Sequence, residues 1–120
     1  MRMANFLPKA VGEDPTFPTA FDVLSMATAG AATVFPGTGC ITAGGKADLI
    51  LIDPSFSHLT PNWNTYSSLV YSAQVTDVRT VIINGKIIMK DWEFLTVDEA
   101  AIKREVRARA EHLVSFGQIR

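Results

Sequence analysis

Apolar residues recur along the first third of the chain with the spacing of a helix. Thr19 stands just before this pattern with Asp22 three residues on, which predicts a capping box with Asp in place of the usual Glu. Four apolar residues behind the cap fall on one face at spacings of three and four: Leu24, Ala27, Ala31 and Phe35. The pattern predicts a helix from about residue 20 to 34, which Pro36 and Gly37 end.

The segment before this helix predicts a short helix and then a loop. Residues 1–11 have the composition of a short helix, but Pro8 argues against a regular one because proline lacks the N–H and clashes with the preceding turn. Residues 13–18 contain Pro15 and Pro18, and two prolines so close together favour a loop.

In the middle of the chain the helical spacing gives way to continuous apolar runs. The first run, Leu49–Ile52, follows a glycine-rich segment at 39–45 and stops at Asp53 and Pro54. Because neither of its faces is polar, we expect a strand that is buried on both sides or lies under helices.

Two further apolar runs predict a β-hairpin. They cover 78–83 and 86–89 and flank the dipeptide Asn84-Gly85. Both central residues of a type I′ turn need positive φ, so Asn-Gly between two apolar runs is a strong hairpin signal. Residues 67–73, before the hairpin, predict a turn or two of helix.

The last part of the chain predicts an amphipathic helix. Thr96 with Glu99 has the spacing of a capping box, and Gly117 is placed to end the helix. Four residues form the apolar stripe: Ile102, Val106, Ala110 and Leu113. Lys103 and Arg109 are expected to face water and to pair with the acids four residues before them, Glu99 and Glu105. A charged face of this kind is a solvated surface rather than a nucleic-acid site.

Composition narrows the class of protein. The 120 residues are enough for one domain, and 48% hydrophobic with 19% charged residues suits a globular chain. A net charge of −1 gives no electrostatic reason to expect nucleic acid or an anionic membrane as partner. We expect no membrane-spanning segment and no signal peptide. A single cysteine, Cys40, fits a reducing cytoplasm, and we interpret it as a small residue filling a turn.

The residues that could carry chemistry are few and scattered. The two histidines, His58 and His112, stand on different elements and belong to no paired metal motif. We expect His58 to cap or bridge backbone groups in a loop and His112 to lie near a helix end. We interpret Asp48 and Asp53 as residues with turn and capping roles. We expect Asp91 and Glu93 to be solvated. Ser67, Ser68 and Ser72 belong to no nucleophile elbow, and Gly37 and Gly39 to no complete nucleotide-binding motif. We therefore assign no catalytic, cofactor-binding or metal-binding residue on this chain.

The order of short motifs, however, resembles the amidohydrolase superfamily in its chlorohydrolase and deaminase branch. The motifs, in chain order, are D-P-T at 14–16, M-A-T at 26–28, G-x-I-x-x-G-x-x-A-D at 39–48, H-L-T-P at 58–61, L-V-Y-S-A at 69–73, V-I-I-N-G-K-I-I-M at 81–89 and L-T-V-D-E at 95–99. That branch includes methylthioadenosine/S-adenosylhomocysteine deaminases, cytosine and guanine deaminases and triazine hydrolases. The chain departs from the pattern at Ala31, where a glycine is usual, and at Gly45, where a lysine is common.

The resemblance implies an α+β fold cut from a larger enzyme. Residues 1–37 would be the last helices of a (β/α)₈ barrel, 38–95 part of a composite β-sandwich with its hairpin at 78–90, and 96–120 a C-terminal helix. In that family the metal, zinc or iron, is held by histidines and an aspartate that lie before the segment matching Met1. None of those ligands can be transferred to a residue of this chain, so we expect no cofactor on it.

The resemblance also implies a function that this chain would not perform alone. It would be the C-terminal fragment of a metal-dependent hydrolase that deaminates a heterocyclic amine or dechlorinates an aryl halide. Two alternatives stay open: a free-standing, non-catalytic oligomerisation or regulatory module derived from such an enzyme, and an unrelated small-molecule binder. Barrel helices without their barrel expose apolar faces, so we expect as partner either a second copy of the chain, in a homo-oligomer, or the missing barrel.

Overall fold

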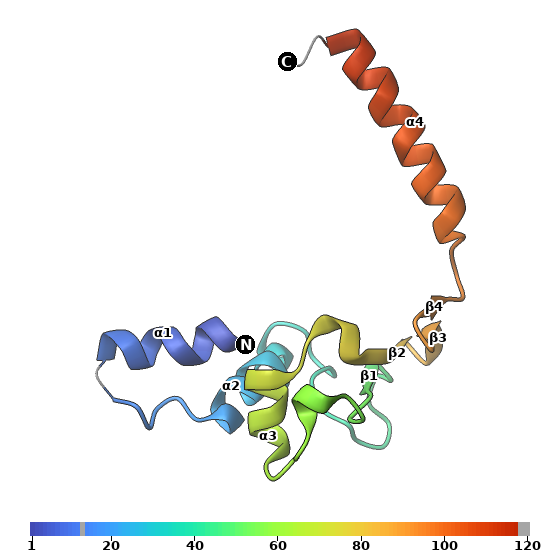
Figure 1. The fold of residues 1–120 in the computed structure, drawn as a ribbon. Helices are drawn as coiled ribbons and strands as arrows, with labels where there is room; N and C mark the ends of the chain where they lie inside the picture. Colours follow the sequence, from blue (N-terminus) through green and yellow to red (C-terminus); the bar gives the residue numbers. More distant parts are fainter. Residues whose placement is uncertain (13, 118–120) are drawn as a thin grey trace.

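The computed structural model describes residues 1–12 and 14–117 of the chain. A helical part comes first: α1 (Arg2–Gly12), α2 (Ala20–Ala27) and the 3₁₀ helix η1 (Ala29–Thr33). Strand β1 (Leu49–Ile52) leads into short turns of helix: η2 (Ser57–Leu59), α3 (Thr65–Ser67), η3 (Ser68–Ser72) and η4 (Val75–Asp77). Strands β2 (Val78–Ile83), β3 (Lys86–Lys90) and β4 (Glu93–Phe94) follow, and α4 (Glu99–Gly117) ends the described part. Figure 1 shows that α4 projects away from the remaining elements.

Helix α1 runs without interruption through Pro8. The proline removes one N–H from the middle of the helix, yet the sequence expectation of an irregular segment is wrong. One reason is that the helix is held from outside: Asn5, in its middle, is fully buried, and its side-chain amide donates to the carbonyl of Pro18 at 3.0 Å. This contact fixes α1 against the loop that leads to α2.

The predicted capping box of α2 is confirmed. The Asp22 N–H donates to the Thr19 hydroxyl at 3.2 Å, and the Asp22 carboxylate accepts from the Thr19 N–H at 2.9 Å. The helix is shorter than expected, however, because it ends at Ala27 rather than near Val34. Thr28 leaves helical geometry, with its hydroxyl donating to the Leu24 carbonyl at 2.8 Å, and the chain tightens into η1.

The strands form an antiparallel sheet in the order β1-β2-β3-β4. The predicted β2–β3 hairpin is confirmed: Asn84 and Gly85 take φ of 49° and 75°, as a type I′ turn requires. A second tight turn joins β3 to β4, and there Asp91 and Trp92 also have positive φ. Strand β1 pairs with β2 from Leu49 opposite Ile82 to Ile52 opposite Val78.

The expectation that β1 is buried on both faces is wrong for these residues. The strand lies at an edge of the sheet, and the side chains of Ile50 and Leu51 are 56% and 54% exposed. The apolar run correctly predicted a strand. Burial, however, depends on what covers the strand, and nothing in the described part covers both of its faces.

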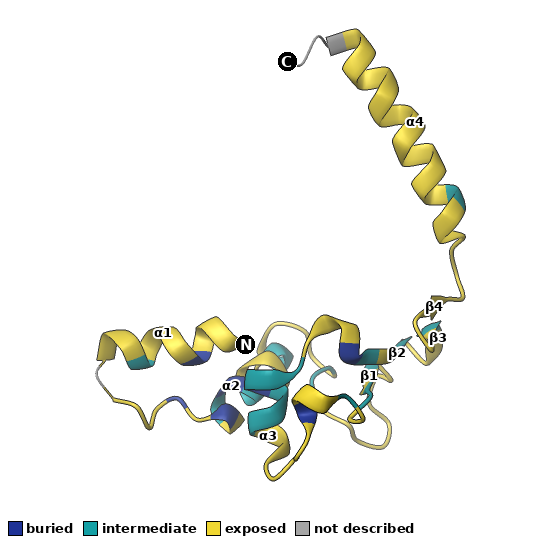
Figure 2. Ribbon diagram, in the orientation of Figure 1, coloured by how far each residue is buried: buried dark blue, intermediate teal, exposed yellow. Residues whose placement is uncertain are grey.

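The core is small and lies where α2 meets η3. It consists of Ala20, Val23 and Val70, with Leu24 and Tyr71 packed against it. Figure 2 shows how little of the ribbon is buried. The Cα radius of gyration is 19.3 Å, whereas a compact domain of this length has one of about 14 Å. The chain is therefore far more extended than an independent globular domain.

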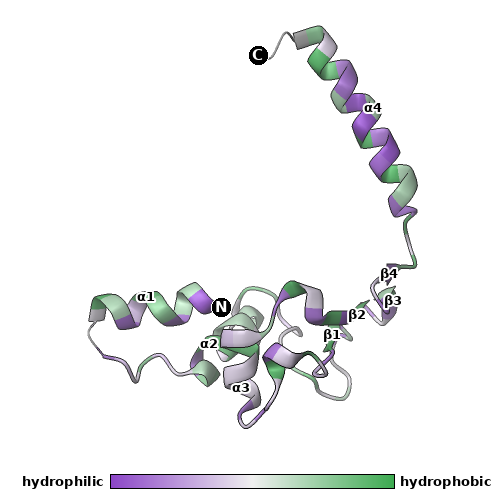
Figure 3. Cartoon of the chain, in the orientation of Figure 1, coloured by the Kyte–Doolittle hydropathy of each residue, from purple (hydrophilic) through white to green (hydrophobic). Residues whose placement is uncertain are grey.

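Helix α4 forms as predicted but with a different cap. The Asp98 carboxylate accepts from the Ala101 N–H at 2.8 Å, so Asp98 and not Thr96 caps the helix that begins at Glu99. Both expected ion pairs are present, Lys103–Glu99 and Arg109–Glu105. Gly117 is the last helical residue, and the residues that would show whether it caps the helix lie outside the described part. Figure 3 shows hydrophobic and hydrophilic residues alternating along α4, and Ile102, Val106 and Leu113 are all exposed.

Candidate functional site

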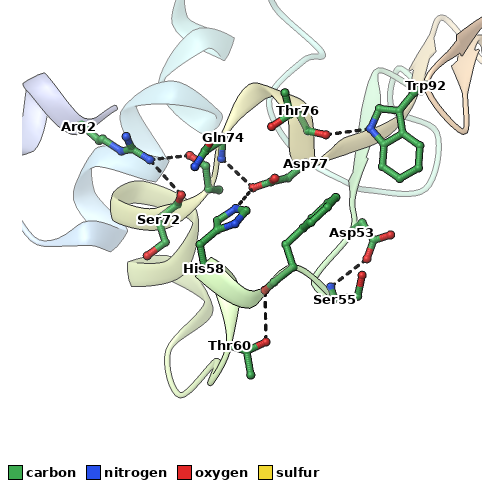
Figure 4. A network of polar contacts seen from close by, with 12 residues as sticks. Arg2, Asp53, Ser55, His58, Thr60, Ser72, Gln74, Thr76, Asp77 and Trp92 are labelled. Carbon is green, nitrogen blue, oxygen red and sulfur yellow. Dashed lines mark hydrogen bonds and ion pairs between the residues drawn. The ribbon is translucent and has the colours of Figure 1, made fainter.

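The two histidines lie on elements that the fold does not bring together. His58 belongs to η2 beside the sheet, and His112 is near the end of α4, with its ring 4.7 Å from that of Phe116. The polar cluster in the body of the molecule is built around His58 and Asp77, the residue that ends η4 just before β2 (Figure 4).

A buried carboxylate is the centre of this cluster. The Asp77 side chain is 1% exposed and that of His58 33%, and the His58 Nε2 lies 2.8 Å from Asp77 Oδ2. The same oxygen accepts from the Gln74 N–H at 2.8 Å. The interpretation of His58 as a bridge between backbone groups is therefore wrong, because its partner is a side chain 19 residues away.

The surroundings of Asp77 hold it in the charged form. Burial pushes the pKa of this carboxyl upward, but the hydrogen bond from Gln74 and the His58 ring outweigh it, so the pKa lies below the ordinary value of 3.8. The other oxygen, Oδ1, is buried without a hydrogen-bond partner among the described residues. A carboxylate so placed joins η2 and η4 to the start of β2.

Asp53 extends the cluster to the end of β1. Its N–H donates to the Asp77 carbonyl at 2.9 Å, and its carboxylate accepts from the Ser55 N–H at 2.9 Å. Hydrogen bonds from Ser55 lower the pKa of Asp53, and the Arg79 charge 3.6 Å away adds to this. Of the turn and capping roles expected of Asp53, the turn role is found, because its carboxylate accepts from the N–H two residues on.

Arg79 and Trp92 form the outer side of the cluster. Arg79 pairs with Asp91 as well as with Asp53, and its guanidinium lies over the Trp92 ring at 5.7 Å. The indole N–H donates to the Thr76 carbonyl at 2.8 Å, as Figure 4 shows. Asp91 was expected to be solvated, and it is half exposed while it takes part in this ion pair.

The charged groups of this cluster hold neighbouring elements together. Each charged group except the inner oxygen of Asp77 is engaged with a neighbour from another element. Among residues 1–12 and 14–117, no three side chains of the metal-binding types come together. The described residues therefore do not fit a catalytic zinc or iron ion, and no step of hydrolysis can be derived from them.

A second polar contact joins α1 to η3, and the sequence analysis did not predict it. The Arg2 guanidinium donates to the carbonyls of Ser72 and Ala73 at 3.0 and 3.1 Å. The Tyr71 hydroxyl donates to the Asn5 side-chain oxygen at 2.9 Å. The one local sign in the sequence was Asn5 itself, a residue of poor helix propensity in the middle of an otherwise helical segment.

The glycine-rich segment before β1 is held at both ends. At one end, a Cβ on Gly39 would stand 2.2 Å from the Thr28 carbonyl oxygen, so only glycine fits against the end of α2. At the other, Asp48 accepts from the Asn84 N–H at 2.6 Å, and the Ala47 carbonyl accepts from the Gly85 N–H at 3.0 Å. Cys40 in this segment is exposed and lies 3.8 Å from the Thr42 hydroxyl, as expected of a residue that fills a turn.

The order of the motifs and the fold indicate the same class of protein, the amidohydrolases. The chain belongs to the amidohydrolase family, whose model matches residues 1–88 of the 120. The resemblance found in the sequence is thereby confirmed.

Two curated relatives show the branch that the chain resembles. It is 47% identical over 116 residues to a 5-methylthioadenosine/S-adenosylhomocysteine deaminase of Syntrophus aciditrophicus, covering 94% of this chain and 26% of that protein. It is 42% identical over 116 residues to a 5'-deoxyadenosine deaminase of Methanosarcina barkeri, covering 96% of this chain and 27% of the relative. The chain thus spans about a quarter of the length of these proteins.

Solved structures share its fold. An adenosine deaminase from Xanthomonas campestris with bound zinc matches with a TM-score of 0.87 and 32% identity, over 95% of this chain and 27% of that one. A triazine hydrolase variant matches with a TM-score of 0.76 and 21% identity, over 89% and 24%. The second likeness shows the fold alone. Among residues 1–12 and 14–117, none of the helices has both the length and the apolar composition of a membrane span.

Proposed function

We propose that this chain is the C-terminal portion of a metal-dependent amidohydrolase that deaminates an adenosine-type nucleoside. The observation that carries the proposal is the match of nearly the whole chain, at 47% identity, to about a quarter of a deaminase. The two curated relatives and the solved structure at 32% identity are named as deaminases, while the triazine hydrolase is 21% identical. Deamination is therefore preferred to dechlorination.

The extended shape supports the same proposal. A radius of gyration of 19.3 Å and a small core mean that the conformation depends on surfaces which the 120 residues do not provide. The adenosine deaminase from Xanthomonas campestris contains the same conformation, with a TM-score of 0.87, and the matched segment covers 27% of that longer chain. In this proposal α1 and α2 are the last helices of a (β/α)₈ barrel, the sheet is part of a composite sandwich, and the enzyme is cytoplasmic.

Alone, the chain would be catalytically inactive, because its residues do not fit the metal. With exposed apolar side chains on α1, α2, α4 and all four strands, it would also self-associate in solution. A folded, oligomeric but inactive chain would fit the alternative of a regulatory module equally well. The two are separated by whether a longer polypeptide that contains this segment has activity.

The experiment compares two proteins. One is the 120-residue chain; the other is the polypeptide encoded when the reading frame is extended upstream of Met1. Both are incubated with zinc and with 5'-methylthioadenosine, S-adenosylhomocysteine or 5'-deoxyadenosine, and ammonia release is measured. We expect release by the longer polypeptide only. Turnover by the 120-residue chain, or stoichiometric zinc bound to it, would contradict the proposal, as would an upstream frame without metal-binding histidines.

A further inference from the structure

The β2–β3 turn carries a dipeptide whose two residues can react with each other. Asn84 and Gly85 are both exposed in this turn, with φ of 49° and 75°. Because glycine has no Cβ, nothing shields the Gly85 nitrogen from the side chain of the residue before it. The side-chain carbonyl carbon of Asn84 is therefore open to attack by the next nitrogen of the backbone.

The reaction that this dipeptide permits is loss of ammonia followed by hydrolysis. The Gly85 nitrogen attacks the side-chain carbonyl carbon of Asn84, and a new C–N bond forms. The side-chain amide nitrogen leaves as ammonia and takes with it the proton of the Gly85 N–H, so that a five-membered imide remains. Water, the one co-reactant, then opens the imide at either of its two carbonyls and leaves aspartate or isoaspartate at position 84.

Two hydrogen bonds from the segment before β1 hold the turn. The Asn84 N–H donates to the Asp48 carboxylate at 2.6 Å, and the Gly85 N–H donates to the Ala47 carbonyl at 3.0 Å. Ring closure requires the Gly85 nitrogen to leave its acceptor and the Asn84 backbone to rotate out of the turn. The two contacts therefore keep Gly85 in a conformation in which its nitrogen is a donor and not a nucleophile.

The other asparagines of the chain lack one or both of the features that make Asn84 reactive. Asn62 and Asn64 are exposed, but they precede a tryptophan and a threonine, whose side chains hinder the attacking nitrogen. Asn5 is fully buried and precedes a phenylalanine. In the sequence, asparagine is followed by glycine at 84–85 alone.

We propose that Asn84 is a site of spontaneous deamidation, and that Asp48 and Ala47 restrain the reaction for as long as β1 stays paired with the hairpin. The reaction in turn weakens this pairing. Aspartate at position 84 brings a second negative charge beside Asp48, and isoaspartate adds a methylene group to the backbone of a two-residue turn. Because ammonia is lost, the change is not reversed when β1 pairs again.

The test follows position 84 while the 120-residue chain is kept at mildly alkaline pH. Mass spectrometry of peptides measures the conversion of amide to acid, and labelling by isoaspartyl methyltransferase measures the isoaspartate fraction. Asp48→Ala removes the acceptor of the Asn84 N–H. We expect it to raise the rate about fivefold, the factor that corresponds to the loss of one hydrogen bond. Asn62 and Asn64 are internal references and should react more slowly than Asn84 in both proteins.

Gly44→Ala is the matched control. Gly44 lies in the same glycine-rich segment with φ of 82°, so alanine there destabilises the chain while both contacts of the turn remain. We expect Gly44→Ala to deamidate at the rate of the unsubstituted chain, because the restraint is local. Equal acceleration in Gly44→Ala and Asp48→Ala, or a rate in native buffer equal to the rate in urea, would overturn the restraint. A rate at Asn84 no higher than at the two reference asparagines would overturn the site itself.

Discussion

The Asp48 carboxylate accepts a 2.6 Å hydrogen bond from the backbone N–H of Asn84, 36 residues further along the chain. Asn84 is the first central residue of the β2–β3 turn, and Asp48 directly precedes β1. One side chain therefore joins the start of one strand to the turn between two others and sets the register of β1 on β2.

Removal of this carboxylate should loosen the hairpin. We expect Asp48→Ala to lower the free energy of unfolding by about 1 kcal/mol, since the turn loses a charged acceptor. Asp48→Asn keeps an acceptor oxygen and should lose less. Urea unfolding measures both, and amide exchange at Asn84 reports on the contact itself. Equal losses for the two variants, with exchange at Asn84 unchanged, would show that the contact has no role.

Gly39 and Gly44 provide a matched pair for the glycine-rich segment. Both have positive φ, 80° and 82°, but only at Gly39 would a Cβ collide with backbone, at 2.2 Å from the Thr28 oxygen. We expect Gly44→Ala to cost about 1 kcal/mol for its backbone conformation alone. Gly39→Ala should cost about 3 kcal/mol or more, because the end of α2 must move as well. Similar urea midpoints for the two variants would contradict the close approach seen here.

His58 should matter more to stability than His112. In His58→Ala the buried Asp77 carboxylate loses one of its two hydrogen-bond donors, and the unfolding temperature should drop by roughly 5 °C. His58→Gln retains a donor and should recover part of that loss. His112→Ala on the exposed helix α4 is the control and should change little. Thermal unfolding followed by circular dichroism compares the three, and a larger effect at His112 would refute the assignment.

Acid should destabilise the chain through several aspartates. Hydrogen bonds from Thr16 lower the pKa of Asp14 and those from Thr19 that of Asp22, and the pKa values of Asp53 and Asp77 are lowered as described above. An aspartate whose pKa is lower in the folded state than in the unfolded state stabilises the folded state at pH values above the ordinary pKa of 3.8. This stabilisation is lost as the pH falls through the pKa of the folded state. The free energy of unfolding should therefore be level near neutral pH and fall below about pH 4.

Asp22→Asn tests that origin. In this variant the free energy of unfolding should fall less steeply below about pH 4, because the carboxylate that accepts from Thr19 is absent and no longer has to be protonated. Glu111→Gln, a neutralisation of the same kind on α4, is the comparison. An unchanged acid limb in Asp22→Asn would assign the acid sensitivity to other groups.

Local patterns in the sequence determined the elements whose causes are local. The Thr19–Asp22 box, the Asn84-Gly85 turn and the ion pairs of α4 each depend on residues within four positions, and each forms as expected. The motif order was also sufficient to identify the family, because it does not depend on how the segments pack.

Tertiary structure decided what depends on distant residues. Helix α2 stops at Ala27 because Thr28 turns there and Gly39 packs against it, and α1 passes through Pro8 while Asn5 is held by Pro18 and Tyr71. His58 is paired with Asp77 across 19 residues, and no spacing rule predicts such a contact. Burial of β1 was predicted from its apolar run and is not found, since burial is a property of the covering surface and a strand's own sequence does not supply it.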